Sequence, residues 1–281
     1  MSLRFRYLLV IVVFGKQPEE CHTLKSLSAM PEDVKHSLRL IIWDNSQQAW
    51  GEKEQSTLYR LVYHTRYEYR HNGGENKPLS WIYNQSISML GDEEFMVIFD
   101  DDSEFDHHLF QRADQAASDY PQTDLFLPIV HADGFIASPA YMWWFKGRFL
   151  KTVTPGLMPS RNHTAINSGM IIRKNYLKAD FPGYDERIQF YCTDNDFMSR
   201  YAEQRKDFYV LDYHMHHHLG FYDESEPFEK KSARLLDQCR ALETLMRRKG
   251  MVAYIMTKCY LAAFTVKYAI RHRDIRYVRL W

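Results

Sequence analysis

Residues 95–102 read FMVIFDDD, an apolar run from Phe95 to Phe99 that stops at three consecutive aspartates. An uninterrupted apolar run of this length is typical of a strand covered on both faces, as in a parallel sheet. Two similar runs lie upstream: LLVIVVF at residues 8–14, and LRLIIW at residues 38–43, which stops at Asp44-Asn45-Ser46. Acidic and polar residues therefore follow the points where two of these predicted strands end.

Helical stretches separate the strands of this first half. Tyr67 to His71 is a further predicted strand, ending at Asn72-Gly73-Gly74, and helices are predicted over Pro18–Ala29 and Pro78–Leu90. Strands that alternate with helices at this spacing indicate βαβ units and a mainly parallel sheet. The first hundred residues therefore predict a nucleotide-binding type of α/β half.

The rest of the chain continues the pattern less regularly, and residues 134–150 are aromatic and irregular. The predicted elements are strands Asp124–Val130, Thr164–Arg173 and Phe208–Tyr213, and helices Thr193–Gln204, Glu229–Lys249 and Val252–Arg271. We expect an α/β fold whose mainly parallel central sheet is flanked by helices, over residues 1–225. A C-terminal helical extension is expected over residues 226–281.

The composition describes a globular protein of 281 residues, with 45% hydrophobic and 15% aromatic side chains. Lys plus Arg equals Asp plus Glu at 36 each, so no global charge favours nucleic acid as a partner. The four cysteines are widely spaced without a Cys-x-x-Cys pair, which fits a reducing compartment and indicates neither a zinc site nor a disulfide framework. No uncharged apolar run approaches the ~20 residues of a transmembrane helix, and we expect a cytoplasmic protein.

The aspartates at strand ends have the chemistry of a ligand site. In parallel α/β sheets ligands bind beyond the carboxyl ends of the strands, where Asp100 and Asp102 can offer oxygens to a hard divalent cation that also holds a diphosphate. The alternative is a solvated turn after a strand. Asp44 can accept hydrogen bonds from a ribose hydroxyl or a base N–H, although Asp-Asn-Ser is also a good turn sequence.

Asp194 falls at the predicted start of the helix Thr193–Gln204. The helix dipole there favours an ionised carboxylate, which is a suitable state for a general base. Thr193 and Asp196 have the spacing of a capping box, which gives Asp196 a structural explanation.

Four of the 13 histidines lie between His214 and His218. Imidazole is a common ligand of borderline transition metals. In an extended segment His214, His216 and His218 would face one side and His217 the other, so only some of them can share a metal. A surface loop with incidental histidines explains the cluster as well.

In this order the motifs resemble the family 2 glycosyltransferases of GT-A fold, and within them the rhamnosyltransferase-like members of bacterial surface-polysaccharide pathways. The resemblance spans roughly Arg6 to Gly220. It rests on seven motifs in the family's order and spacing: LRLIIWDN (38–45), YRHNGGENKPLSWIYN (69–84), VIFDDD (97–102), INSGMIIR (166–173), YDER (184–187), TDNDF (193–197) and HHLG (217–220). The first strand departs from the pattern, because Phe14-Gly15-Lys16 stands where a Thr-Tyr-Asn type sequence is common, and Thr193 replaces a frequent acidic residue.

The resemblance implies an inverting, metal-dependent hexosyltransferase that moves a sugar from a nucleotide-diphosphate sugar to a saccharide or lipid-linked saccharide acceptor. Carried over by position, the catalytic base would be Asp194. The nucleotide would be bound by Asp44, Asn72, Asp100 and Asp101. Mn²⁺ or Mg²⁺ would be bound by Asp102 and His217, with His214 and His216 as alternatives to His217.

Two other functions fit parts of the sequence. A haloacid-dehalogenase-like, Mg²⁺-dependent phosphatase also places Asp-x-Asp after an apolar strand. That strand is usually the first, whereas about three strand candidates precede this one. A non-catalytic nucleotide-sugar-binding protein that kept the fold would carry the same motifs.

The C-terminal region is basic. From Gly250 to Trp281 six lysines and arginines stand against Asp274 alone, a net charge of +5, and aromatic and aliphatic residues lie between them. Such a segment suits an anionic membrane surface, at about 1 kcal/mol per basic residue. We expect peripheral attachment to the inner face of the cell membrane, close to a lipid-linked acceptor.

Overall fold

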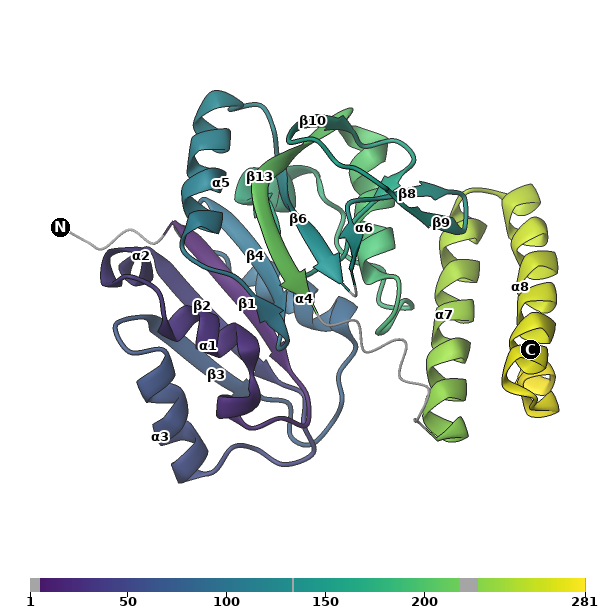
Figure 1. The fold of residues 1–281 in the computed structure, drawn as a ribbon, viewed down its shortest axis with the longest axis horizontal. Helices are drawn as coiled ribbons and strands as arrows, with labels where there is room; N and C mark the ends of the chain where they lie inside the picture. Colours follow the sequence, from purple (N-terminus) through teal and green to yellow (C-terminus); the bar gives the residue numbers. More distant parts are fainter. Residues whose placement is uncertain (1–5, 133, 218–226, 281) are drawn as a thin grey trace.

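The computed structural model describes residues 6–132, 134–217 and 227–280, and one large sheet runs through its centre (Figure 1). Across this sheet the strands follow the order β10 (Gly156–Pro159), β13 (Asp207–His217), β6 (Leu125–Ala132), β12 (Met170–Arg173), β4 (Phe95–Asp100), β1 (Tyr7–Val13), β2 (Leu38–Asp44) and β3 (Arg66–His71). Two short strands extend it: β5 (Ser103–Glu104) pairs with β13, and β7 (Phe135–Ser138) pairs with β6.

Most of the long strands run in one direction. β4, β1, β2 and β3 are mutually parallel, and β13 is parallel to β6. β12 is antiparallel to both β4 and β6, so β6 runs in the same direction as β4. The expected mainly parallel central sheet is thus confirmed, with β12, β10 and the two short strands β5 and β7 running antiparallel to their neighbours.

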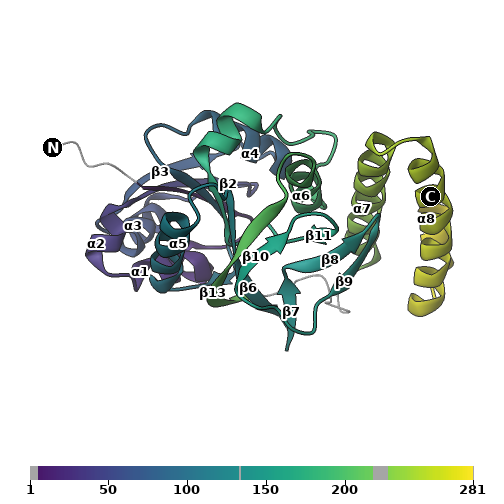
Figure 2. The same ribbon diagram turned by 90° about the horizontal axis from the view of Figure 1, so that it is seen from above.

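Helices cover both faces of the sheet, which explains why β1 is buried along its whole length (Figure 2). Leu9 and Ile11 of β1 pack on one side and Leu8 and Val10 on the other. The first side is covered by η1 (Pro18–Glu20), α1 (His22–Ser28), α2 (Glu32–His36), α3 (Glu52–Leu61) and α5 (His108–Asp119). The second side is covered by α4 (Leu79–Ser88), η2 (Tyr176–Asp180) and α6 (Thr193–Gln204).

The strand expected over Thr164–Arg173 is divided in the structure. Its first residue belongs to β11 (His163–Thr164), and β12 begins only at Met170. Between them Gly169 has a φ of +86°, and a Cβ at this position would lie 2.8 Å from Pro128 Cγ. A turn that only glycine fits therefore replaces the centre of the expected strand.

The aromatic stretch at residues 134–150 also forms ordered structure. β8 (Ala140–Trp143) pairs with β9 (Lys146–Phe149) and with β11 in a small second sheet. The β8–β9 hairpin turns at Trp144, whose φ is 56°. The rings of Phe145 and Tyr260 pack in a tilted arrangement with centroids 4.5 Å apart, so this hairpin contacts the C-terminal helices.

Two long helices follow the described part of the sheet domain. α7 (Phe228–Arg248) and α8 (Met251–His272) pack on each other, and η4 (Ile275–Leu280) folds back onto them. α7 lies between the sheet domain and α8, as Figures 1 and 2 show. The expected boundary at residues 225–226 lies outside the described residues. Among the described residues, no helix combines the length and the apolar character needed to cross a membrane.

Candidate active site

The strand-end aspartates gather at the carboxyl edge of the parallel strands. Val12 of β1 is in register with Asp100 on one side, and Val13 is in register with Asp44 on the other. The backbone of the aspartate triplet is held in place: the Asp100 N–H donates to Ser168 Oγ (3.2 Å) and the Thr23 hydroxyl donates to the Asp100 carbonyl (2.5 Å). The edge therefore presents a fixed row of carboxylates.

Asp100, Asp102 and His217 form a candidate metal centre. One ligand atom from each lies within 4.8 Å of the others. Asp102 Oδ1 is 3.2 Å from His217 Nδ1, and this buried oxygen accepts no hydrogen bond from any described residue. The antiparallel pairing of His217 with Ser103, which directly follows Asp102, explains how a distant strand reaches the triplet.

The charge at this edge is only partly balanced. Burial, together with the neighbouring carboxylates of Asp102, Asp101 and Asp194, raises the pKa of Asp100 to about 8. Burial also raises the pKa of Asp102, against the opposing effect of His217. Lys16 Nζ lies 2.5 Å from Asp101 Oδ1 and offsets part of the charge. Buried carboxylates with raised pKa values fit a site that accepts a cation.

The histidine run continues β13 instead of forming a loop after it. His217 is nearly buried and faces Asp102. His214 and His216 are exposed and their rings lie near His131 of β6 instead. The alternation expected from an extended segment is thus confirmed, and of these three histidines the structure places His217 beside the aspartates. His218 lies outside the described residues, as do Leu219 and Gly220 of the HHLG motif.

Asp194 lies in the first turn of α6 and is half-buried. Its Oδ1 accepts a hydrogen bond from the Asn195 N–H at 2.7 Å. Burial raises the pKa of Asp194 to about 6, and its charge contributes to the raised pKa of Asp100. The carboxylate is therefore close to the aspartate triplet and ionised at pH 7.

The expected capping box at the start of α6 is wrong. The N-cap is Cys192, with a φ of 65° and no side-chain cap. Thr193 Oγ1 instead accepts a hydrogen bond from Asn167. Asp196 is fully buried and binds Arg200 Nε at 2.9 Å and Arg248 Nη1 at 2.6 Å. The role of Asp196 is structural, as expected, but it fastens α6 to α7.

Asp44 is fully buried at the end of β2. Its oxygens accept hydrogen bonds from the Ser46 N–H (2.9 Å) and from the Tyr69 hydroxyl (2.5 Å). Asn72 Nδ2 donates to Asn45 Oδ1 at 2.5 Å. Asp44 and Asn72 thus hold the strand-end loop that carries Asn45 and Ser46, each of which lines a cavity.

A cavity of about 640 Å³ opens beside this edge. Asp100 at the end of β4 and Asp101 directly after it line this cavity, and Phe190 and Tyr191 line it from the loop before α6. The facing wall belongs to α7 and consists of Lys230, Ala233, Arg234, Leu236, Asp237 and Arg240. Asp237 Oδ2 accepts hydrogen bonds from the N–H groups of Phe190 (3.2 Å) and Tyr191 (3.0 Å). A helix expected in the C-terminal extension therefore shapes the cavity.

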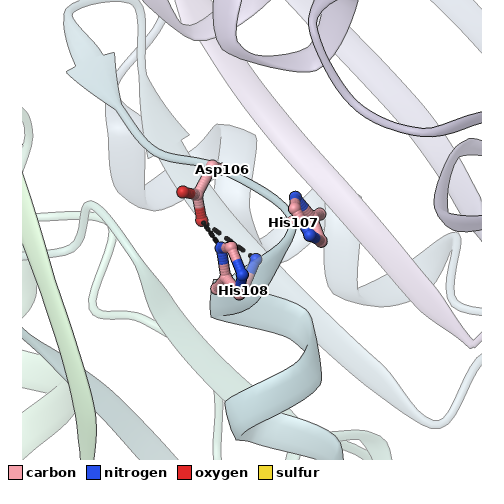
Figure 3. A group of neighbouring side chains, drawn as sticks. All are labelled: Asp106, His107 and His108. Carbon is pink, nitrogen blue, oxygen red and sulfur yellow. Dashed lines mark hydrogen bonds and ion pairs between the residues drawn. The ribbon is translucent and has the colours of Figure 1, made fainter.

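A second metal-ligand group, Asp106, His107 and His108, precedes and begins α5 (Figure 3). Asp106 Oδ1 accepts hydrogen bonds from the His108 N–H (2.9 Å) and contacts His108 Nδ1 (3.2 Å). Asp106 and His108 are exposed, and the positive end of a helix is an unfavourable place for a cation. The donor set at Asp102 is the better cation site.

Sequence reasoning missed several of these contacts. Lys16 belongs to the stretch that departs from the family's pattern, so no motif marked it. Ser168 lies within the INSG motif but was given no role. Asp237 accepts its hydrogen bonds within the described chain from backbone N–H groups, which leave no trace in a side-chain pattern.

Neither the family models nor the curated proteins contain a match to this sequence. Solved structures do match its fold. S. aureus TarS 1–349 aligns with a TM-score of 0.56 and 10% identity over 85% of this chain and 71% of that chain. The same TarS fragment in complex with UDP-GlcNAc gives 0.56 and 12% identity over 84% and 66%. GalNAc-T7 with UDP, GalNAc and Mn²⁺ gives 0.58 and 10% identity over 83% of this chain and 48% of that one.

These neighbours are GT-A-type glycosyltransferases. The fold is GT-A. At such identities the likeness concerns the fold alone, and this chain spans about half of the GalNAc-T7 chain. The α/β architecture expected from the order of motifs is confirmed.

Proposed function

We propose that this protein is an inverting glycosyltransferase that moves a sugar from a nucleotide-diphosphate sugar to a saccharide acceptor. The observation that carries the proposal is the group of Asp100, Asp102 and His217 at the carboxyl edge of a GT-A sheet, beside a cavity of about 640 Å³. Solved neighbours of this fold hold UDP-GlcNAc, or UDP with Mn²⁺. The phosphatase and the non-catalytic binding protein remain as outcomes of the test below.

The donor would lie in this cavity. Asp44 and Asn72 would act on the nucleotide through the loop that they hold, and Asp100 and Asp101 line the cavity directly. The α7 wall offers Lys230, Arg234 and Arg240, whose positive charges suit a diphosphate. The nucleotide and phosphates would therefore lie between the strand ends and α7.

The donor set fits a divalent cation, because Asp102 Oδ1 is buried, accepts no well-aligned hydrogen bond from a described residue, and lies 3.2 Å from Nδ1 of His217, the other proposed ligand. Asp102 and His217 would hold Mn²⁺ or Mg²⁺, and mixed carboxylate and imidazole ligation suits Mn²⁺ at least as well as Mg²⁺. When bound, the cation would stabilise the negative charge that develops on the leaving diphosphate.

Asp194 would remove the proton from the acceptor hydroxyl as that hydroxyl attacks the anomeric carbon. With a pKa of about 6 it is mostly ionised at pH 7 while still basic enough to accept the proton. A single displacement from the face opposite the leaving group inverts the anomeric configuration. Asp194 belongs to α6, whereas the aspartate triplet ends β4 and forms the turn after it, so the base and the leaving-group site come from different segments.

We extend this proposal to the acceptor, the pathway and the location of the protein. The sequence resemblance supports a rhamnosyltransferase-like role in bacterial surface-polysaccharide synthesis, with a lipid-linked saccharide as acceptor and the protein on the inner face of the cell membrane.

α8 would provide the attachment to the membrane. Its outward face carries exposed apolar side chains at helical spacing: Val252, Ile255, Met256, Val266 and Ile270. The exposed Lys267 and Arg271 belong to the same helix, and this pattern suits an anionic lipid surface.

The first experiment is thermal unfolding with UDP, dTDP and GDP sugars, each with Mn²⁺, Mg²⁺ or EDTA. A ligand at a hundred times its Kd stabilises a protein by ~2.7 kcal/mol. We expect stabilisation by one nucleotide class that disappears with EDTA. If no nucleotide sugar stabilises the protein and simple phosphate monoesters are hydrolysed, the phosphatase is the function. Binding without transfer or hydrolysis would identify a binding protein.

Two variants and one control separate the proposed roles. Asp102→Asn should lose metal-dependent donor binding. Its control, Asp106→Asn in the exposed group at α5, should retain that binding. Asp194→Asn should bind donor normally and transfer about 10²- to 10⁴-fold more slowly. Near-normal turnover of Asp194→Asn would remove this residue from the base role.

Membrane attachment is tested on the full chain with the double variant Ile255→Ser/Ile270→Ser. We expect it to bind donor normally and to co-sediment with vesicles of anionic phospholipid less than the unchanged protein. Equal co-sedimentation would refute attachment through this face.

A further inference from the structure

Three histidines lie together on the exposed surface of β6 and β13, away from the aspartates. The two strands are parallel neighbours, and His216 is in register with His131 (Figure 1). His214 precedes His216 by two residues, so both side chains emerge on the same face of β13. Met215 is fully buried and His217 faces Asp102, so these two side chains lie on the inner face of β13. His214 and His216 lie on its outer face.

The imidazole nitrogens are already close. His131 Nε2 lies 2.7 Å from His214 Nδ1, and their rings are stacked with centroids 5.0 Å apart. The ring of His216 lies 5.8 Å from that of His131. At this distance one imidazole donates an N–H hydrogen bond to the other, and a metal ion would take the place of that proton. The ligand atoms of the three histidines do not all lie within 4.8 Å of one another, so the exposed His216 side chain has to rotate to bring a third nitrogen to the metal.

This cluster lies outside the cavities described above. Neither the cavity between the strand ends and α7 nor the one behind the Gly15–Gln17 loop has any of these histidines in its wall. The donor site therefore gives no reason for this cluster.

We propose that His131, His214 and His216 form a binding site for a borderline transition-metal cation such as Zn²⁺, separate from the hard-cation site at Asp102. Zn²⁺ binds imidazole nitrogen at about 2.0–2.1 Å in tetrahedral geometry, which places two ligand nitrogens about 3.3 Å apart. His131 Nε2 and His214 Nδ1 need to separate by only about half an ångström to reach that spacing. Three histidines leave one tetrahedral position for water or another ligand.

The chemistry also separates the two sites. Imidazole ligands suit Zn²⁺, Cu²⁺ and Ni²⁺, whereas carboxylates suit Mg²⁺ and Mn²⁺. A metal held here would join β6 to β13, the strand that carries His217. The inference does not depend on the proposed transferase function.

The test is a titration of the full chain with Zn²⁺ and, for spectroscopy, with Co²⁺, in an excess of Mg²⁺ that saturates the hard-cation site. We expect one bound Zn²⁺ per chain and a tetrahedral Co²⁺ absorption spectrum. His131→Asn and His214→Asn, made separately, should each weaken binding at least tenfold. Both replace half-buried or exposed side chains, and circular dichroism confirms that each variant is folded.

Matched controls identify the site. His108→Asn removes a histidine from the exposed group at α5, and Asp102→Asn removes a ligand from the hard-cation site; both should bind Zn²⁺ as the unchanged protein does. Absence of Zn²⁺ binding overturns the proposal. Unchanged affinity in both His131→Asn and His214→Asn overturns it as well, as does loss of binding in either control.

Discussion

The two C-terminal helices, α7 and α8, are nearly equal in length and pack on each other, yet their remaining faces differ. α7 turns charged side chains toward the sheet domain: Asp237 holds the backbone of Phe190 and Tyr191, and Arg248 binds the buried Asp196. α8 turns apolar side chains away from the protein, and Ile255 and Ile270 are 54% and 73% exposed.

This contrast shows that one part of the C-terminal helical extension lines the cavity of the candidate active site and the other part does not. α7 fixes the loop that precedes Asp194 and also α6, the helix that carries Asp194. It lines the cavity as well. α8 contacts α7 and η4, and its outer face has no packing partner among the described residues. α7 thus belongs structurally with the candidate active site, whereas α8 is available for a different surface.

The largest expected effect is at the link between α6 and α7. Asp196→Ala leaves Arg200 and Arg248 without their buried partner, and breaking a buried ion pair costs about 3–5 kcal/mol. Urea unfolding at pH 7 measures the loss.

Asp194→Asn, two residues away on the same turn, is the control. Burial raises the pKa of Asp194 in the folded protein, so above about pH 6 the charge of this carboxylate destabilises the folded protein. Removing this charge should leave stability unchanged or raise it. Equal losses in Asp196→Ala and Asp194→Asn would mean that α7 is not anchored through Asp196.

A smaller effect is expected at Asp237. Asp237→Ala leaves two backbone N–H groups of the loop before α6 without an acceptor, at about 1–3 kcal/mol. Because this loop lines the cavity proposed to bind the donor, donor affinity should fall about tenfold, measured by calorimetry with the nucleotide sugar. Asp237→Asn keeps an acceptor oxygen and should restore most of the affinity. If Asp237→Ala binds donor normally, α7 packs beside the site without shaping it.

The central strands were predictable because of their complete burial. β1, β2 and β4 are apolar runs, and strand ends in a parallel sheet meet at one edge, so Asp44 and Asp100 could be placed together from sequence. The range predicted for α6 matches the observed helix, Thr193–Gln204. Alternation along β13 correctly separated His217 from His214 and His216.

Other elements were less predictable. α3 was not predicted, although it is as amphipathic as α7; of its ten residues, Leu58 is fully buried. α7 showed an amphipathic pattern, but that pattern does not state which residues meet its polar side chains. The contacts of Asp237 and Arg248 join residues more than 40 positions apart in the chain. Only the fold brings these partners together.

The pH dependence should separate the proposed catalytic role of Asp194 from the proposed membrane binding through α8. If Asp194 is the base, transfer should fall about tenfold for each pH unit below its pKa of about 6, because protonation removes the basic form. Binding to anionic vesicles relies on lysine and arginine and should not fall over the same range. Initial rates and co-sedimentation between pH 5 and 7.5 measure both. A transfer rate that is constant over this range would contradict the role of Asp194.

The smallest effect is expected on the outer face of α8. Ile255→Ser/Ile270→Ser replaces side chains that stay in water after folding, so little buried apolar area is lost, and the free energy of unfolding should change by no more than about 0.5 kcal/mol per site. Donor affinity should be unchanged, in contrast to Asp237→Ala. Urea unfolding at two protein concentrations provides the control. A loss above about 1 kcal/mol per site that grows with protein concentration would mean that a second copy of the chain covers this face, since only buried apolar surface contributes such energies.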